Sequence, residues 1–204
     1  MSAWIARALA AMLAAAPCVA WAQAAATPPR TVSCEGPIAR DADEASVIAL
    51  FGRANVAFQE VSGSEGETAM ATVVFPGDAR NRLDISWYDE RKRPATITIG
   101  GESQWTGPKG LKIGMTLADV QALNGRPFQL SGFDWDYGGY VTDWRGGALP
   151  DVGGCSVTLR FEHAVRVPAS VLRPLLGDIK LMSSAAAVRA VRPAVSEIVL
   201  SFPQ

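Results

Sequence analysis

Residues 47–53 read VIALFGR and residues 120–126 read VQALNGR, so Val, Ala, Leu, Gly and Arg return in the same order 73 positions later. Apolar residues at helical spacing that are followed by a glycine are typical of a helix that ends at that glycine. The repetition indicates that one small α/β unit has been used twice. The sequence therefore describes an architecture before it describes any reaction.

A polar residue precedes each copy where a helix is expected to begin. Before the first copy, Asp41 or Asp43 is the expected cap, and Glu44 completes a capping box with Asp41. Before the second copy, Thr116 is the expected cap, with Asp119 in the first turn. Helices of only about ten residues are not stable alone, so both are expected to lie on an apolar sheet face.

Alternating apolar and polar side chains predict strands that have one buried face and one wet face. The alternation runs through residues 83–88, 96–99 and 157–162, and residues 197–202 form a last strand after a helix over 184–192. Polar segments at 75–78 and 89–94, the latter with three consecutive basic residues at its tip, favour hairpins. The predicted fold class is α+β: two tandem units, each a helix plus an antiparallel meander, with the helices packed on one face of the sheet.

Four segments follow from these patterns. We expect a signal peptide over 1–22, a flexible leader over 23–32, a first α/β module over 33–101, and a second α/β module over 102–204 that includes the C-terminal helix and strand. The glycines between residues 100 and 110 suit turns and fit no phosphate-binding loop.

The first 22 residues indicate export. They carry one charge, Arg7, followed by a run of small apolar residues and by Ala-Trp-Ala at 20–22, a pattern that signal peptidase cleaves. The expected location is the periplasm or the exterior, with cleavage before Gln23 as the default and lipid attachment at Cys18 as the alternative. Elsewhere the sequence has no apolar run near the ~20 residues that a membrane-spanning helix needs.

Cys34 and Cys155 are the two thiols that remain. In an oxidising compartment such a pair is expected to form a disulfide. This bridge would close a loop of about 120 residues, for which the chain-entropy model gives about 5 kcal/mol of stabilisation as an upper value. A redox-active role is the alternative, and it would need closely spaced cysteines or a lowered thiol pKa.

Residues 132–147, which read GFDWDYGGYVTDWRGG, hold the densest group of aromatic and acidic side chains. Tyr and Trp offer large rigid contact areas with polar groups, so this segment is the candidate binding surface. The alternative is that its rings face the core while its glycines make turns. The candidate binding residues are Asp134, Trp135, Asp136, Tyr137, Tyr140 and Trp144.

Catalysis and metal binding find little support in the sequence. His163 is the only histidine, and no nucleophile elbow accompanies it. Asp134 and Asp136 imitate the start of a calcium loop or a glycosidase pair, but the other calcium ligands are missing. We therefore expect no catalytic residue, no metal and no cofactor. A formal net charge of −1 provides no electrostatic footprint for nucleic acid.

Residues 113–127, which read IGMTLADVQALNGRP, resemble the opening "GMT…V…L-G-x-P" of two related envelope families. These are the β-lactamase-inhibitor-protein-like modules and the SmpA/OmlA lipoproteins of outer-membrane assembly. The resemblance implies a two-module α/β fold whose sheet presents a binding face, an aromatic-rich strand such as residues 133–137 after the helix, and no catalysis.

The sequence thus favours an exported bacterial envelope protein that binds another envelope protein without acting as an enzyme. Its partner and its oligomeric state are left open. Two alternatives remain: an envelope hydrolase that uses His163 or the pair Asp134 and Asp136, and a structural maintenance factor with no ligand.

Overall fold

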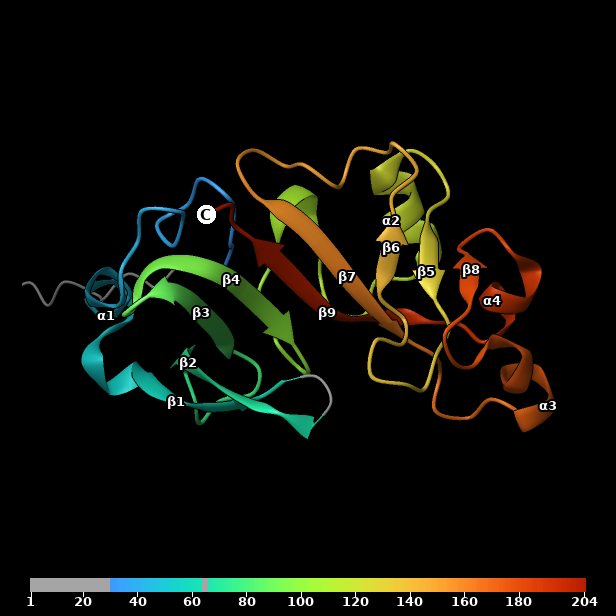
Figure 1. Ribbon diagram of the computed structural model, residues 1–204, viewed down its shortest axis with the longest axis horizontal. Helices are drawn as coiled ribbons and strands as arrows, with labels where there is room; N and C mark the ends of the chain where they lie inside the picture. Colours follow the sequence, from blue (N-terminus) through green and yellow to red (C-terminus); the bar gives the residue numbers. More distant parts are fainter. Residues whose placement is uncertain (1–29, 64–65) are drawn as a thin grey trace, which may run out of the picture.

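The computed structural model describes residues 30–63 and 66–204. The predicted signal peptide, Cys18 and all but the last three residues of the predicted leader lie outside these ranges. Among the described residues, no helix has both the length and the apolar composition that crossing a membrane requires. The mixed α+β class with antiparallel sheets is confirmed, and Figure 1 shows its arrangement.

The two repeated segments form helices of equal length, α1 (Glu44–Phe51) and α2 (Leu117–Asn124). The cap of α2 is as predicted: Thr116 and Asp119 form a capping box, and Gly125 ends the helix in the left-handed conformation. The predicted box of Asp41 and Glu44 is wrong. Asp43 caps α1 and exchanges hydrogen bonds with Ser46, because a box partner must lie three residues after the actual cap.

A six-stranded antiparallel sheet forms the centre of the molecule. After the short η1 (Arg53–Asn55), four strands follow one another along the chain and pair as a meander, and the last two strands come from the second half. In spatial order they are β1 (Val56–Ser62), β2 (Thr68–Val74), β3 (Leu83–Asp89), β4 (Lys92–Gly100), β9 (Ala194–Ser201) and β7 (Ser156–Glu162).

Both predicted units contribute to this sheet. The last strand of the chain, β9, lies between β4 of the first unit and β7 of the second, and Ile97 on β4 pairs with Leu200. Residues 101 and 102, between which the sequence predicts a module boundary, form the turn after β4, and the sheet continues from one predicted module to the other through β9. The sequence repeat marks two helices, and one sheet joins the segments that follow them.

A smaller sheet completes the second half (Figure 1). Its order is β6 (Val141–Asp143), β5 (Gln129–Ser131) and β8 (Lys180–Met182), and an isolated bridge between Tyr140 and Arg160 links it to β7. The second half also contains short helical turns: η3 (Pro108–Gly110) before α2, α3 (Ala169–Leu172) and η4 (Arg173–Leu175) between β7 and β8, and α4 (Ala186–Ala190) between β8 and β9. The helix predicted over 184–192 is thus a shorter α4.

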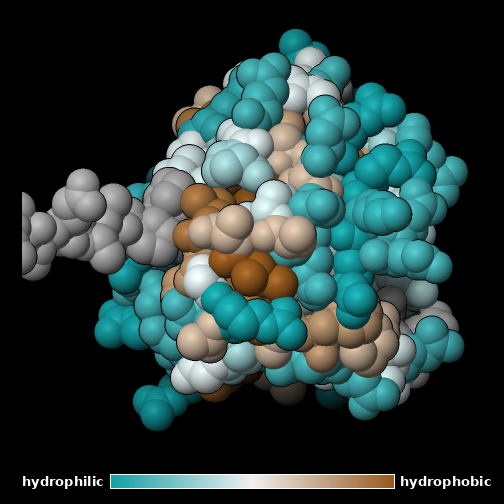
Figure 2. All heavy atoms as spheres, turned by 90° about the vertical axis from the view of Figure 1, so that its left-hand side faces the viewer, coloured by the Kyte–Doolittle hydropathy of each residue, from teal (hydrophilic) through white to brown (hydrophobic). Residues whose placement is uncertain are grey.

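One hydrophobic core serves both halves. Val47 and Phe51 of α1 belong to the same buried cluster as Val120 of α2 and the inward strand residues Ile85 and Ile97. Figure 2 shows the end of the molecule near α1, where a hydrophobic patch lies among hydrophilic side chains. The two short helices gain their stability from packing their buried side chains in this shared core rather than from their own helix propensity.

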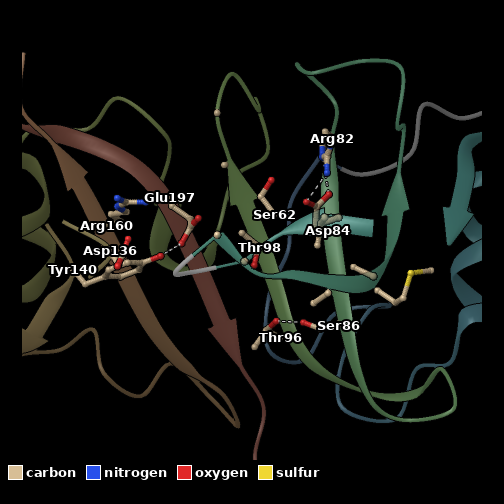
Figure 3. A pocket seen from close by; sticks show the side chains of 18 of the residues that line it. Ser62, Arg82, Asp84, Ser86, Thr96, Thr98, Asp136, Tyr140, Arg160 and Glu197 are labelled. Atoms are coloured by element: carbon tan, nitrogen blue, oxygen red, sulfur yellow. Dashed lines mark hydrogen bonds and ion pairs between the residues drawn. The ribbon is translucent and has the colours of Figure 1, made fainter. Parts of the chain in front are cut away.

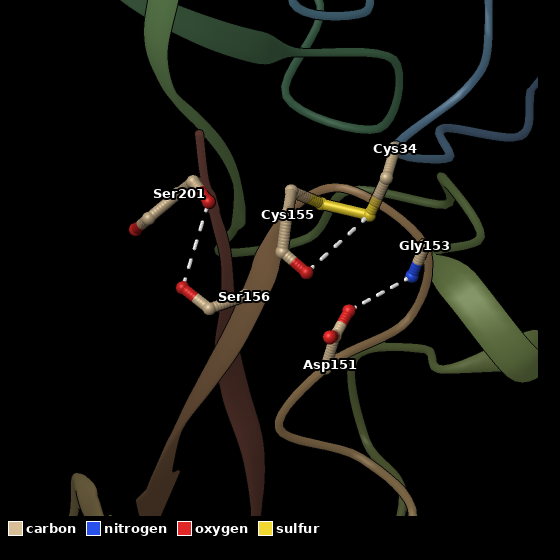
Figure 4. The surroundings of a disulfide bond; sticks show 6 residues. All are labelled: Cys34, Asp151, Gly153, Cys155, Ser156 and Ser201. Carbon is tan, nitrogen blue, oxygen red and sulfur yellow. Dashed lines mark hydrogen bonds between the residues drawn. A yellow bond between two sulfur atoms is a disulfide. The ribbon is translucent and has the colours of Figure 1, made fainter. Parts of the chain in front are cut away.

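The Cys34–Cys155 disulfide is present, as predicted. Both cysteines are buried, with Cα atoms 5.3 Å apart (Figure 4). Cys155 immediately precedes β7, and Cys34 lies in the segment before α1, so the bridge ties the start of the described chain to the second half. The two halves of the chain are therefore joined twice, by this covalent bond and by the hydrogen bonds between β4 and β9.

Candidate functional site

The face of the six-stranded sheet that points away from the core is polar at its centre. Asp84 lies opposite Thr98, and Ser86 lies opposite Thr96, in the register of β3 and β4. Their neighbours Ile85 and Ile97 point to the core and are fully buried. The alternation that the sequence shows in these strands therefore separates an apolar side from a side lined by hydroxyl and carboxylate groups.

This face is hollowed into a cavity of about 800 Å³, which we call the sheet hollow. Strands β1 to β4 form one side of it, and the aromatic segment with β7 and β9 forms the other (Figure 3). Its volume falls in the range of about 300–1,000 Å³ that is typical of ligand pockets. Its polar lining side chains include Ser62, Arg82, Asp84, Ser86, Thr96, Thr98, Glu102, Asp136, Tyr140, Arg160 and Glu197.

The aromatic segment reaches the hollow as a loop. The strand expected over residues 133–137 is wrong, because this stretch forms bends and turns between β5 and β6. Glycines decide this shape: a Cβ on Gly139 would lie 1.9 Å from the carbonyl oxygen of Phe161, and the φ of Gly139 is +76°. Only glycine allows this close approach, which brings the loop against β7.

Tyr140 anchors the loop at the edge of the hollow. Its hydroxyl donates a 2.6 Å hydrogen bond to Oε1 of Glu197 on β9, and the guanidinium carbon of Arg160 lies 5.3 Å from the centre of its ring. Burial and the hydrogen bond to Glu197 raise the pKa of Tyr140 well above its usual value of 10.0. The hydroxyl therefore stays protonated and keeps donating to Glu197 across the physiological range.

Across the hollow, Asp84 of β3 is paired with Arg82, the residue before this strand. Arg82 donates two hydrogen bonds to Asp84, at 2.8 and 2.9 Å, and side-chain hydroxyls of Ser86 and Thr96 are hydrogen-bonded to each other. The bidentate contact holds both side chains in one geometry. This side of the hollow is preorganised by the protein itself.

Two carboxylates of the hollow are left without such partners. Neither Asp136 nor Glu102 takes part in a hydrogen bond or an ion pair with the part of the chain that the structure describes. Counting the charged lining residues, four acids face two arginines. The hollow therefore carries an excess of negative charge that no described side chain neutralises.

The structure separates the six predicted binding residues. Trp135, Asp136 and Tyr140 line the hollow. Tyr137 is 46% exposed beside it and packs edge-on against Trp135, with ring centres 5.5 Å apart. Trp144 does not belong to this surface: it is 8% exposed, packs on Phe128 and donates its indole N–H to the carbonyl of Val157.

Asp134 lies outside the hollow and binds His163. Its Oδ1 is 2.9 Å from Nε2 of His163, while Nδ1 of His163 lies 2.9 Å from the carbonyl oxygen of Ala164. Burial lowers the pKa of His163, but the hydrogen bonds to Ala164 and Asp134 outweigh it, so the pKa lies above the usual 6.5. Because both partners are acceptors, the doubly protonated ring satisfies them best.

The contacts of His163 differ from those that the hydrolase alternative needs. A catalytic histidine uses one ring nitrogen to hold an acidic residue and the other to take a proton from a nucleophile. In His163 the second nitrogen faces a backbone carbonyl. Asp136 does not accompany Asp134 there, since it points into the hollow (Figure 3). Within residues 30–63 and 66–204, no group of three or more His, Cys, Asp or Glu side chains is arranged to hold a metal ion.

Sequence reasoning did not single out Thr96, Thr98, Arg160 and Glu197, although all four line the hollow. All four are polar members of the alternating strands, and the alternation predicts a wet face there but no hollow. The pairing that brings Glu197 beside Arg160 spans 37 residues, and no local pattern indicates it.

Comparison with protein-family models, with curated proteins and with solved structures gave no match in any of the three.

Proposed function

We propose that this protein is exported to the bacterial envelope and works as a non-enzymatic binding module, which holds a basic segment of a partner protein in the sheet hollow. The observation that carries the proposal is the hollow itself. Two sides, from different halves of the chain, meet around an open polar space of about 800 Å³.

The charge of the hollow supports a basic partner. Asp136 and Glu102 have no hydrogen-bonding or ionic partner among the described residues, whereas Asp84 already binds Arg82 and Glu197 accepts from Tyr140. A Lys or Arg side chain entering the hollow would gain contacts that no described residue now supplies. Such charge complementarity raises the rate of association and selects the partner.

Aromatic contacts support a protein partner rather than a small ion. Trp135 lines the hollow and Tyr137 lies beside it, half-exposed. Rings of this type are common energetic centres of protein interfaces, because they bury a large area at little entropic cost.

Export is supported by the N-terminal pattern of residues 1–22 and by the disulfide, which persists in oxidising compartments. The resemblance of residues 113–127 to envelope modules points in the same direction. Cleavage before Gln23 gives the mature protein in this proposal, and lipid attachment at Cys18 is the alternative, which intact mass would distinguish.

A pull-down from envelope extract with two matched variants tests the proposal. Thr98→Arg places bulk and positive charge in the hollow, and Thr142→Arg makes the same change at an exposed position of β6. We expect a partner retained by the wild type to be retained by Thr142→Arg and lost from Thr98→Arg.

A charge-reversal variant sharpens the test. The double substitution Asp136→Lys and Glu102→Lys should weaken binding of that partner at least tenfold, and added salt should weaken wild-type binding as well. Equal retention by the wild type, Thr98→Arg and the double variant would refute the hollow as the binding site.

A further inference from the structure

A second groove lies between α2 and the end of α4, and it shares no lining residue with the sheet hollow. Its volume is about 750 Å³. Its walls are mostly short and apolar, with Ala118 and Ala122 on α2 and Pro127 and Pro193 at the segment ends. The alanine and proline part of this surface has no side-chain hydrogen-bonding group, so that part suits a hydrocarbon better than a peptide backbone.

Three arginines, Arg126, Arg189 and Arg192, line this apolar groove. Arg126 donates to the carbonyl of Arg145 at 3.1 Å, while the side chains of Arg189 and Arg192 have no hydrogen bond or ion pair within the described chain. No carboxylate is among the described lining residues. The nearby Asp119 is occupied by Thr116 in the cap of α2.

The groove is held by backbone contacts between its two sides. Thr116 forms an isolated antiparallel bridge with Ala194, and Val195 exchanges hydrogen bonds of 2.8 Å with Gly114 and Met115. Arg192 itself adopts a left-handed backbone with φ of 46°, which is uncommon and costly for a residue with a side chain. The backbone at the arginine end of the groove is therefore held by the fold.

We propose that this groove binds a single-chain anionic amphiphile, whose hydrocarbon chain lies on the alanine and proline surface and whose carboxylate or phosphate head contacts Arg189 and Arg192. Three arginines without a lining carboxylate give the groove a positive potential, which attracts an anionic head. Arginine also binds both head groups through paired hydrogen bonds. The inference is independent of the proposed function, because it uses a different surface.

Isothermal titration calorimetry of the full chain tests this inference. Decanoate, decyl phosphate and decyl maltoside are each added below their micellar concentrations. We expect saturable binding of decanoate, of decyl phosphate, or of both, and no binding of decyl maltoside, which has the decyl chain of the phosphate and a neutral head. The comparison of the two acids tells whether the natural ligand is a fatty acid or a phosphate-headed lipid. Failure of both anions to bind, or equal binding of the maltoside, would overturn the inference.

Variants locate the binding. The double substitution Arg189→Ala and Arg192→Ala should weaken the affinity at least tenfold, and Ala122→Trp should abolish binding by filling the groove from an exposed position of α2. Arg166→Ala and Ala169→Trp make the same changes at exposed positions that do not line the groove, and they should bind as the wild type does. Binding that none of the variants changes would place the amphiphile elsewhere and contradict the inference.

Discussion

The hydroxyl of Tyr140 donates a 2.6 Å hydrogen bond to Glu197, which fastens the aromatic loop to β9, the strand between the two halves of the sheet. The contact joins two parts of the chain that are 57 residues apart. It defines one side of the hollow, and its strength can be measured.

Tyr140→Phe should destabilise the protein by about 1–2 kcal/mol, because it removes a hydrogen bond to a charged group that is half-buried. The wild-type pKa of Tyr140 is raised, so the stability it contributes is complete below pH 10 and is lost as pH rises through the higher folded value. Absorbance near 295 nm should show a tyrosine ionisation well above pH 10 that Tyr140→Phe removes. Loss of an ionisation near the ordinary pKa of tyrosine on this substitution would contradict the contact.

The close approach of Gly139 to β7 predicts a larger effect. Gly139→Ala must displace the loop, since its Cβ would meet the Phe161 carbonyl at 1.9 Å. Gly146 has a similar φ of +70° but no atom closer than 3.8 Å to the added carbon. Gly146→Ala should therefore cost only about 1–2 kcal/mol of backbone strain, while Gly139→Ala should cost several kcal/mol. Chemical denaturation of both variants measures the difference, and equal losses would refute the steric account.

The His163 contact predicts a pH-dependent stability. Its pKa is raised in the folded state, so the contribution is fully present below the unfolded value of about 6.5 and disappears as pH rises through the folded pKa. Asp134→Asn keeps the shape and tolerates the left-handed φ of 57° at this position. Its melting temperature should fall below that of the wild type at pH 5.5, and the gap should narrow by pH 8.5. A gap that is constant with pH would mean that the imidazolium is not involved.

The Cys34–Cys155 bridge should contribute about 3–5 kcal/mol, given the long loop it closes. Cys34→Ser and the double variant Cys34→Ser with Cys155→Ser should lose nearly the same free energy of unfolding, because either one removes the bond. Urea denaturation measures this loss. Free thiols in the mature wild-type protein under non-reducing mass spectrometry would contradict the pairing.

The sequence predicted well what depends on neighbouring residues. Thr116, Asp119 and Gly125 mark both ends of α2, and the alternation in residues 83–88 predicts β3. It predicted the disulfide by elimination among few thiols. Each of these features follows from chemistry within a few positions or from a simple count.

Predictions failed where distant contacts decide the structure. Residues 133–137 look like a strand, but Gly139 packs against Phe161 and bends the chain into a loop. The sequence offers Trp144 as a candidate binding residue, but in the fold Trp144 is buried and packs on Phe128. The hollow depends on β9 entering between β4 and β7, and that pairing leaves no trace in the local sequence.

The most direct test of the central claim is site-specific photo-crosslinking in the envelope, with the crosslinking amino acid at Thr98 inside the hollow or at Thr142 outside it. We predict one discrete protein adduct from position 98, weakened by salt and by Asp136→Lys, and none from position 142. No adduct at position 98, or the same adducts from both positions, would contradict the account.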